Sequence, residues 1–146
     1  MKIGFACDHG GLELKNSLMA HAKEKGFEVT DYGTFTKDSC DYPDFAYLCA
    51  KSVADGVNER GVVVCTTGIG VSMVANKVKG VRCALCHSIR DAEMTRRHNN
   101  ANMIAMGQSS TDEGLADEML DVFLSTEFEG GRHERRVNKI TAIENL

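Results

Sequence analysis

The sequence lacks several features that would point to other classes of protein. Its apolar runs fall well short of the roughly 18 residues that cross a bilayer, and the opening run over residues 3–7 is too short for a secretory signal. The net charge of −4 gives no general attraction to nucleic acid or to anionic membranes. Repeats, low-complexity segments and linkers are also missing. We therefore expect a cytoplasmic protein that binds neither nucleic acid nor membrane.

Six cysteines are present, but the chain does not need a disulfide framework. A chain of 146 residues can bury a full core, so we expect free thiols in one domain that spans residues 1–146. Cys83, Cys86 and His87 match the spacing of a c-type haem attachment or of a zinc pair. A strand is expected over residues 81–86, where side chains three apart point to opposite faces. This motif therefore predicts neither haem nor zinc.

Apolar segments and turn residues alternate in a regular order along the chain. Proline is nearly absent, and the only one, Pro43, opens a predicted helix. The expected strands cover residues 3–7, 27–31, 62–64, 81–86 and 102–107, with helices between and after them. Five such alternations are typical of an α/β fold with a parallel sheet that helices cover on both faces.

The stretch over residues 62–72 carries the most specific local signal. Three valines form a buried strand, and Gly68 and Gly70 then allow a sharp turn into a helix that begins near Gly70. The start of such a helix presents unpaired N–H groups to an anion or to a developing oxyanion. Cys65 lies at the rim of this space, where the thiolate form is favoured. Cys65 is either a reactive thiol or a small buried apolar residue at the strand end.

The helix after this turn is indicated by the apolar spacing of Ile69, Met73 and Val74. The glycine pattern is incomplete for a nucleotide site. The third glycine of a dinucleotide fingerprint would fall at Met73, and the lysine of a P-loop is absent. The glycines therefore predict a turn for an anion without predicting a nucleotide.

Polar residues are expected at two edges of the sheet. Asp8 and His9 end the first strand and Cys65 ends the third, and ligands of such sheets bind at these carboxyl ends. Asp8 is either a helix cap or a carboxylate that contacts sugar hydroxyls or relays protons, and His9 is available to a phosphate. His98 and Asn99 precede the fifth strand, at the other edge. They are either structural or brought to the thiol by a neighbouring subunit, which predicts a dimer.

Arg132 and Arg136 open the last helix, where a cation is unfavourable by about 0.3–1 kcal/mol. They lie four residues apart on one helix face, so that both guanidinium groups can grip one phosphate. The alternative is a solvated basic turn whose charge is balanced by nearby glutamates, Glu127, Glu129 and Glu134.

Together these motifs resemble the ribose-5-phosphate isomerase B family, which includes galactose- and allose-6-phosphate isomerases. The resemblance runs from end to end, through residues 7–11, 31–34, 41–43, 65–70, 75–77, 96–99, 102, 129–133 and 140–144. It implies a Rossmann-like three-layer αβα sandwich around a five-stranded parallel sheet, without cofactor or metal. It also implies a homodimer or a dimer of dimers with shared active sites, in which the C-terminal helix, about residues 133–145, packs on a partner subunit.

The resemblance further implies an aldose–ketose isomerase that acts on a sugar phosphate through a cis-enediolate. Cys65 would be the base that moves the proton, and Thr67 would help to hold the enediolate oxygens. His98 from the partner subunit would open the furanose ring, with assistance from Asp8. The implied substrate contacts are His9, Tyr42, Thr66, Gly68, Ile69, Gly70, Asn99, Ser109, Arg132 and Arg136.

Three positions depart from the family pattern or distinguish its branches. Some members use a glutamate where this chain has Val71, so Cys65 has no substitute here. The family usually has glycine at the position of Thr66, whose side chain would narrow the mouth of the site. It commonly has an arginine at the position of Ser109, so one phosphate contact is missing. These departures leave the identity of the sugar open.

Three hypotheses about function follow. The first is the interconversion of ribose 5-phosphate and ribulose 5-phosphate. The second is the same chemistry on a hexose 6-phosphate of the allose or galactose type, on a tetrose phosphate or on a free sugar. The third is a sugar-phosphate binding module without activity. The set of Asp8, Cys65, Thr67 and His98 argues against the third, because binding alone needs no thiol base.

Overall fold

The computed structural model describes residues 1–146 and is built from alternating strands and helices. The strands are β1 (Lys2–Cys7), β2 (Glu28–Asp31), β3 (Arg60–Cys65), β4 (Cys83–Leu85) and β5 (Met103–Gly107). The helices are the 3₁₀ turn η1 (His9–Gly11), α1 (Leu12–Glu24), α2 (Tyr42–Ala54), α3 (Ile69–Ala75), α4 (Ile89–Asn99), α5 (Glu113–Ser125) and α6 (Arg132–Ile143). None of them combines the length and apolar character needed to cross a bilayer.

The five strands form one parallel sheet in the order β2-β1-β3-β5-β4. From β1 the chain moves outward to β2, and from β3 it moves the opposite way, to β4 and β5. The direction of winding therefore reverses between the neighbouring strands β1 and β3. The crevice at the carboxyl ends of two such strands is the usual ligand site of an open α/β sheet.

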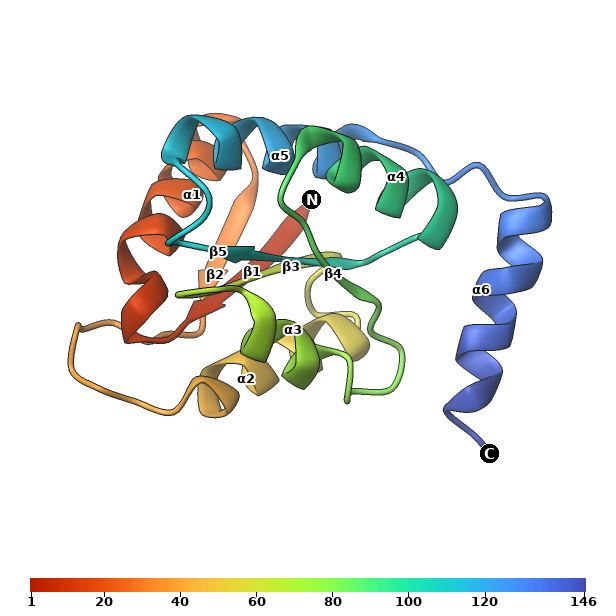
Figure 1. Cartoon of the computed structure of the whole chain (residues 1–146), viewed down its shortest axis with the longest axis horizontal. Helices are drawn as coiled ribbons and strands as arrows, with labels where there is room; N and C mark the ends of the chain where they lie inside the picture. The colour runs from red at the N-terminus through yellow and green to blue at the C-terminus, as the bar shows by residue number, and fades with distance from the viewer.

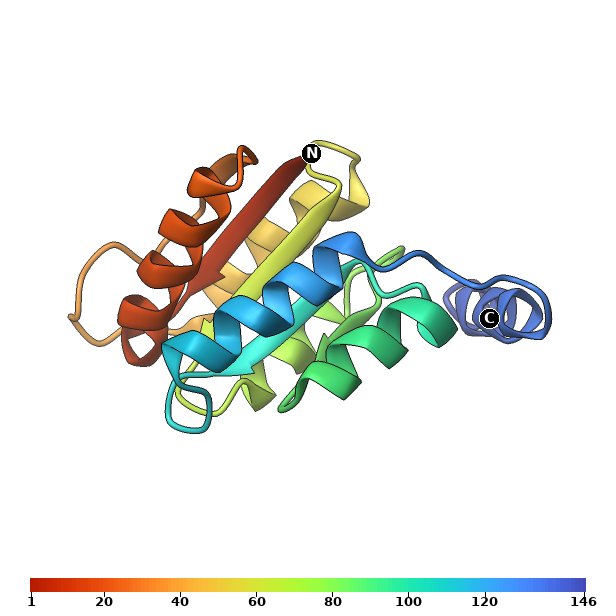
Figure 2. The same ribbon diagram turned by 90° about the horizontal axis from the view of Figure 1, so that it is seen from above.

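Helices cover both faces of the sheet. α1, α4 and α5 lie on one face, while α2 and α3 lie on the other (Figure 1). Seen from above, α1 and α5 run nearly alongside the strands that they cover (Figure 2). This arrangement confirms the predicted three-layer αβα sandwich with five parallel strands.

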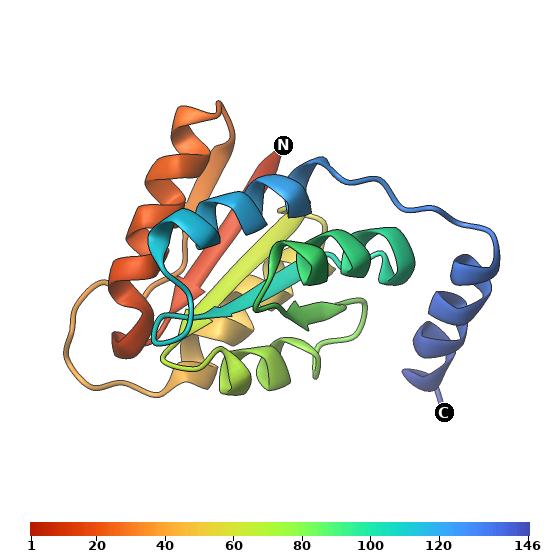
Figure 3. The ribbon, with the colours of Figure 1, turned by 45° about the horizontal axis from the view of Figure 1, so that its top comes forward.

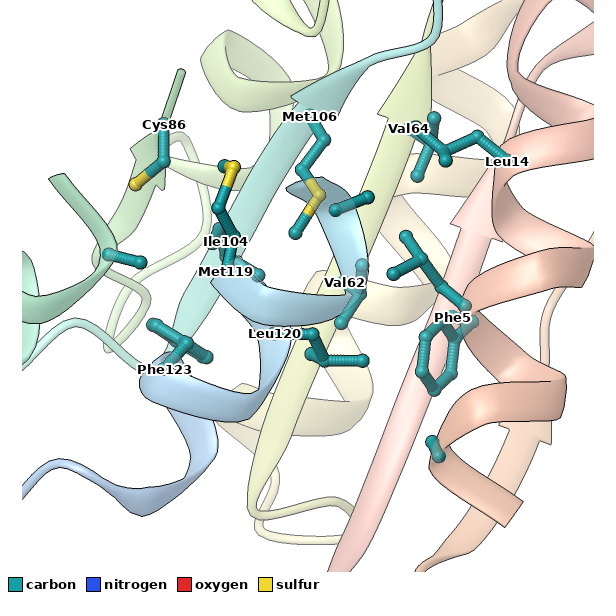
Figure 4. Packing of buried hydrophobic residues seen from close by; sticks show 14 of the residues in the cluster. Phe5, Leu14, Val62, Val64, Cys86, Ile104, Met106, Met119, Leu120 and Phe123 are labelled. Atoms are coloured by element: carbon teal, nitrogen blue, oxygen red, sulfur yellow. The ribbon is translucent and has the colours of Figure 1, made fainter. Parts of the chain in front are cut away.

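Each face of the sheet buries its own apolar core. Side chains of β3 alternate between the two cores, so Val62 and Val64 face α1 and α5 while Val63 faces α2 and α3. The larger core includes Phe5 of β1 and Phe123 of α5 and is shown in Figure 4. By the same alternation Cys65 belongs to the smaller core. The thiol therefore lies on the face that carries α2 and α3.

Strand β4 is shorter than the sequence predicts. It covers Cys83–Leu85 and not residues 81–86, and Cys86 lies just beyond its end. Cys83 packs against the core under α2 and α3, whereas Cys86 is buried in the core under α1 and α5. The two sulfurs therefore lie on opposite faces, as expected, and cannot bind one metal ion or one haem together.

Helix α3 is present where the sequence predicts it, but it buries other residues. Ile69 and Met73 are 48% and 63% exposed, whereas Val71 and Ala75 are fully buried. The helix is only seven residues long, and its buried Val71 and Ala75 belong to the core on the side of α2. The larger apolar side chains consequently form an exposed surface.

Helix α6 lies apart from the sandwich, at the end of an extended segment that follows α5 (Figure 3). It contacts α4, and the Glu144 carboxylate just beyond its end accepts the Gly80 amide (2.9 Å). Val137 is buried, but Ile140 and Ile143 are 46% and 65% exposed. The apolar face of α6 is thus only partly covered by its own chain.

Candidate active site

Asp8 and Cys65 lie at the carboxyl edge of the sheet, where the direction of winding reverses. Cys7 of β1 pairs with Val64 of β3, so Asp8 and Cys65 lie on neighbouring strands at the same level. The Asp8 amide donates to the Val64 carbonyl (3.3 Å). The Asp8 carboxylate accepts the Gly10 amide (2.9 Å) and caps η1. The predicted cap is therefore confirmed, and it holds a carboxylate beside the end of β3.

The turn after β3 folds back onto the sulfur of Cys65. The Gly68 amide donates a hydrogen bond to Cys65 Sγ (3.1 Å), and an N–H directed at a sulfur favours negative charge there. Gly68 has a φ of +79°, and a Cβ at this position would lie 2.6 Å from Leu85 Cδ1. Only glycine combines a positive φ with the absence of a Cβ that would clash. Cys65 is 5% exposed, and the exposed Thr66 and Thr67 follow it, so the sulfur is held beside a polar rim.

The first turn of α3 leaves backbone amides without partners. The Thr67 hydroxyl accepts the Ile69 amide (3.2 Å), whereas the amides of Gly70 and Val71 have no hydrogen-bond partner in the chain. Unpaired N–H groups at a helix start attract an anionic oxygen. The family resemblance also implies that amides around Gly68 hold the enediolate oxygens, but in the structure the Gly68 amide already donates to the Cys65 sulfur.

Four other cysteines differ from Cys65 in their surroundings. The sulfurs of Cys7 and Cys49 donate to backbone carbonyls and accept no amide. Burial raises the pKa of Cys7 to about 11 and the pKa of Cys49 and Cys86 to about 12, and it raises the pKa of Cys83 as well. These four thiols therefore stay protonated at neutral pH.

His9 is exposed at this edge, and a neighbouring loop orients its ring. The Cys40 amide donates to His9 Nδ1 (3.2 Å), and the Cys40 sulfur lies 3.8 Å from the same nitrogen. A nitrogen that accepts an N–H carries no proton, so the neutral ring holds its proton on Nε2. His9 can thus offer Nε2–H to an anion. Sequence reasoning missed the contact with Cys40, because the loop before α2 carries no motif at that position.

Three further predicted contacts surround the same edge. The Tyr42 ring at the start of α2 covers Gly70, where a Cβ would lie 2.7 Å from the ring. The Thr66 hydroxyl lies against Gly10, where an added Cβ would displace it. Ser109 donates its hydroxyl to the Thr66 carbonyl (2.6 Å). The structure therefore brings together Asp8, His9, Tyr42, residues 65–70 and Ser109.

His98 and Asn99 lie at the end of α4, near the opposite edge of the sheet. α4 leads into the start of β5 at Met103, whereas β5 ends at Gly107, which pairs with Cys65. The five residues of β5 separate these two levels by roughly 13 Å. His98 and the Cys65 thiol therefore do not meet within one chain. The order of the elements in the sequence predicts this separation.

The ring of His98 instead stacks on His133 of α6. The ring centroids are 4.1 Å apart and the planes are inclined by 10°. Glu129 Oε1 lies 3.8 Å from His98 Nε2 and 3.5 Å from His133 Nε2, and Arg97 Nη1 lies 3.6 Å from Glu129 Oε2. Sequence reasoning missed this cluster, because only the packing of α6 on α4 creates it. The four-residue spacing of Glu129 and His133 is its one local signal.

Arg132 and Arg136 are exposed on the first turns of α6 and form no ion pair within the chain. Glu129 pairs with Arg97 and the two stacked histidines, so it does not balance these arginines. The two guanidinium groups remain open to an anion on the same helix that carries His133.

The larger cavities of the single chain lie away from Cys65. One of about 450 Å³ separates α6 from the sandwich, and its lining includes Asn99, Ile140 and Ile143. Another of about 510 Å³ lies between α2 and α3 and includes Tyr47. A substrate at the Cys65 turn is therefore not enclosed by the residues of one chain.

Comparisons with known proteins agree on one family. A family model described as Ribose/Galactose Isomerase matches residues 3–140. The ribose-5-phosphate isomerase B of Escherichia coli (strain K12) is 43% identical over 143 residues, which are 98% of this chain and 96% of that protein. The D-erythrulose-4-phosphate isomerase of Pectobacterium atrosepticum is 40% identical over 146 residues, which are 99% of this chain and 96% of that protein.

Solved structures agree with the same family over nearly the whole chain. The ribose-5-phosphate isomerase B of Clostridium thermocellum superposes with a TM-score of 0.98 at 46% identity, covering 99% of this chain and 98% of that one. The enzyme from Mycoplasma genitalium, solved with bound ribulose-5-phosphate, superposes with a TM-score of 0.95 at 42% identity, covering 99% and 96% of the two chains.

Proposed function

Since this chain belongs to the ribose/galactose isomerase family and is thereby an aldose–ketose isomerase of sugar phosphates, we propose that it interconverts ribose 5-phosphate and ribulose 5-phosphate. The observation that carries the proposal is the turn after β3. There the Cys65 sulfur accepts the Gly68 amide beside the unpaired amides of Gly70 and Val71. A base and a site for an anionic oxygen thus lie side by side, which is what proton transfer next to a carbonyl requires.

In the proposed reaction, the Cys65 thiolate removes the proton from C2 of the open-chain aldose. The electron pair of that C–H bond forms the C1–C2 double bond, and the negative charge moves to O1, near the free amides of α3. The O2 hydroxyl proton passes to O1, and the sulfur returns its proton to C1. O2 then becomes the carbonyl oxygen of the ketose. The Thr67 hydroxyl lies next to these amides and holds the enediolate in its cis form.

Ribose 5-phosphate is mostly a closed furanose, so ring opening must precede this transfer. We assign it to His98, which gives a proton to the ring oxygen as the C1–O4 bond breaks, with Asp8 taking the proton of the anomeric hydroxyl. Tyr42 and Asn99 would contact the sugar. His9 would bind the phosphate through Nε2–H together with Arg132 and Arg136.

This assignment requires a second copy of the chain, because His98 and Cys65 lie near opposite edges of one sheet. We propose a homodimer, alone or paired into a dimer of dimers, in which each site takes Cys65 from one subunit and His98 from the other. The exposed Ile140 and Ile143 of α6 fit the proposal that the C-terminal helix, about residues 133–145, packs on a partner. A cytoplasmic location and a role in the pentose phosphate pathway are further predictions.

A tetrose phosphate is the second candidate substrate. The Thr66 side chain lies against Gly10 at the mouth of the site, and Ser109 supplies no positive charge there. A smaller sugar fits such a site more easily, and a relative named D-erythrulose-4-phosphate isomerase is 40% identical. Hexose 6-phosphates and free sugars are less favoured, since the first need more room and the second would leave Arg132 and Arg136 unused.

Turnover by the purified protein tests the proposal directly. Ribose 5-phosphate, erythrose 4-phosphate, allose 6-phosphate, galactose 6-phosphate and free ribose are compared by kcat/KM. We expect ribose 5-phosphate to give the highest value. A higher value for erythrose 4-phosphate would favour the second candidate. Absence of turnover with every substrate would favour a sugar-phosphate binding module without activity.

A further inference from the structure

The cluster of His98, Glu129 and His133 brings together three separate elements. His98 ends α4, Glu129 lies in the extended segment before α6, and His133 is in the first turn of α6. Glu129 Oε1 is within 4 Å of Nε2 of both rings. Its other oxygen faces Arg97, which also pairs with Glu93 (2.9 Å). The carboxylate is therefore held from one side by an arginine and turned toward the two imidazoles.

The stacking of the two rings is unfavourable for a metal ion. An imidazole binds a metal in its own plane, at about 2.0–2.1 Å from the nitrogen. The planes of His98 and His133 are nearly parallel, with centroids 4.1 Å apart. An ion between the two Nε2 atoms would therefore lie far out of both planes. The geometry instead places one carboxylate oxygen within ion-pair distance of both rings, 3.8 Å from His98 Nε2 and 3.5 Å from His133 Nε2.

The two rings differ in exposure. The side chain of His133 is 10% exposed and packs behind His98, whereas the side chain of His98 is 40% exposed. Burial, helped by the neighbouring charges of His98 and Arg132, lowers the pKa of His133. His133 therefore favours its neutral form, and His98 is the ring that lies open to a ligand.

We propose that Glu129 and His133 are positioning residues that hold His98 for ring opening, His133 by fixing the plane of its ring and Glu129 by fixing the direction of Nε2. This inference rests on the proposed function, in which His98 transfers a proton to the ring oxygen. Neither residue touches the substrate in this assignment. The stack lets His98 turn only within its own plane, and the carboxylate then selects one orientation in that plane.

The chemistry of the substrate separates this role from proton transfer at carbon. Ribose 5-phosphate closes to a furanose through its free O4. Erythrose 4-phosphate carries its phosphate on O4 and cannot close in this way, so its isomerisation skips ring opening. Ribulose 5-phosphate is also open-chain, because its phosphate occupies O5. Loss of a ring-opening group therefore slows turnover of ribose 5-phosphate and spares these two substrates.

The test compares Glu129→Gln and His133→Ala with Glu134→Gln, an exposed carboxylate on the same helix that has no partner in the cluster. We expect the first two to lower kcat for ribose 5-phosphate by about 10- to 100-fold, while turnover of erythrose 4-phosphate and ribulose 5-phosphate changes less than about twofold. Glu134→Gln should match the wild-type protein. His133→Phe keeps a flat ring in the stack and should restore most of the activity that His133→Ala loses.

Three outcomes would overturn the inference. Equal loss on closed and open substrates would show a general structural effect, and circular dichroism of each variant would identify unfolding as its cause. No loss on ribose 5-phosphate would show that His98 needs no positioning. Failure of His133→Phe to recover activity would exclude stacking as the role of His133. By contrast, absence of ribose 5-phosphate turnover in the wild-type protein would contradict the proposed function itself.

Discussion

The Cys65 turn and the His98 cluster are built in different ways. At the Cys65 turn, backbone amides supply most of the interactions, and the register of β1, β3 and β5 fixes their places. At the His98 cluster, side chains from α4, α6 and the segment between α5 and α6 supply all of them. A backbone site tolerates changes of side chain outside its glycines, whereas a side-chain cluster depends on how two helices meet.

The two regions also differ in how firmly the chain holds them. β3 is fully covered by both cores and lies in the middle of the sheet. Helix α6 stands off the sandwich and leaves Ile140 and Ile143 exposed. In the proposed dimer, the firmly held region would supply proton transfer and the cluster on α6 would supply ring opening.

The largest expected effect follows from removal of the sulfur. Cys65→Ala should lower kcat by about 10²- to 10⁴-fold, the usual contribution of a general base. Open-chain and closed substrates should suffer alike, because both need proton transfer at carbon. Steady-state kinetics measure this, with Cys83→Ala as the matched control, since that thiol is protonated and lies away from the turn. Full activity of Cys65→Ala would contradict the assignment of Cys65 as the base.

Mixing two inactive variants tests whether the halves come from different subunits. Cys65→Ala and His98→Asn each spoil one half of the site, so a mixed dimer contains one intact site and one doubly spoiled site. Random reassembly of equal amounts should recover about a quarter of wild-type turnover of ribose 5-phosphate, since half of the dimers are mixed. If each site were built from a single chain, the mixture would be no more active than its two components.

A smaller effect is expected at the turn itself. Gly70→Ala places a Cβ 2.7 Å from the Tyr42 ring, so the ring or the first turn of α3 must move. We expect kcat/KM to fall about tenfold through the displaced amide. Gly114→Ala in α5 is the control, because its Cβ would meet only Asp112 Oδ1 at an ordinary 3.5 Å. Equal kinetics in both variants would show that the amide of residue 70 plays no part.

The smallest effect is a gain at the rim. Ser109→Arg supplies a cation that the family commonly has at this position, at the loss of the hydroxyl contact to the Thr66 carbonyl. The Ser109 amide still donates to the same carbonyl (3.0 Å), so the loop should keep its shape. KM for ribose 5-phosphate should fall about 3- to 10-fold at low salt, and less at high salt. Ser109→Gln, which lengthens the side chain without adding a charge, should not lower KM.

Local patterns predicted the elements of the fold and half of the site. Three valines, two glycines and a cysteine in one stretch placed the thiol at a strand end before a helix, and the structure agrees. The apolar spacing of Ile69, Met73 and Val74 predicted helix α3 correctly, but it did not reveal that Ile69 and Met73 are exposed. The hydrogen bond from the Gly68 amide to the Cys65 sulfur could not be predicted from the sequence either, since it depends on the φ angle of Gly68.

Sequence alone determined which residues can carry the chemistry and which end of the sheet each one reaches, because the order of strands and helices fixes the edge at which every connection lies. Tertiary structure alone decided which side chains meet there. The stack of His98 on His133, the carboxylate of Glu129 between them and the contact of Cys40 with His9 join residues from separate elements. Such contacts follow from how the helices and loops pack, and packing is a property of the whole core that no short segment encodes.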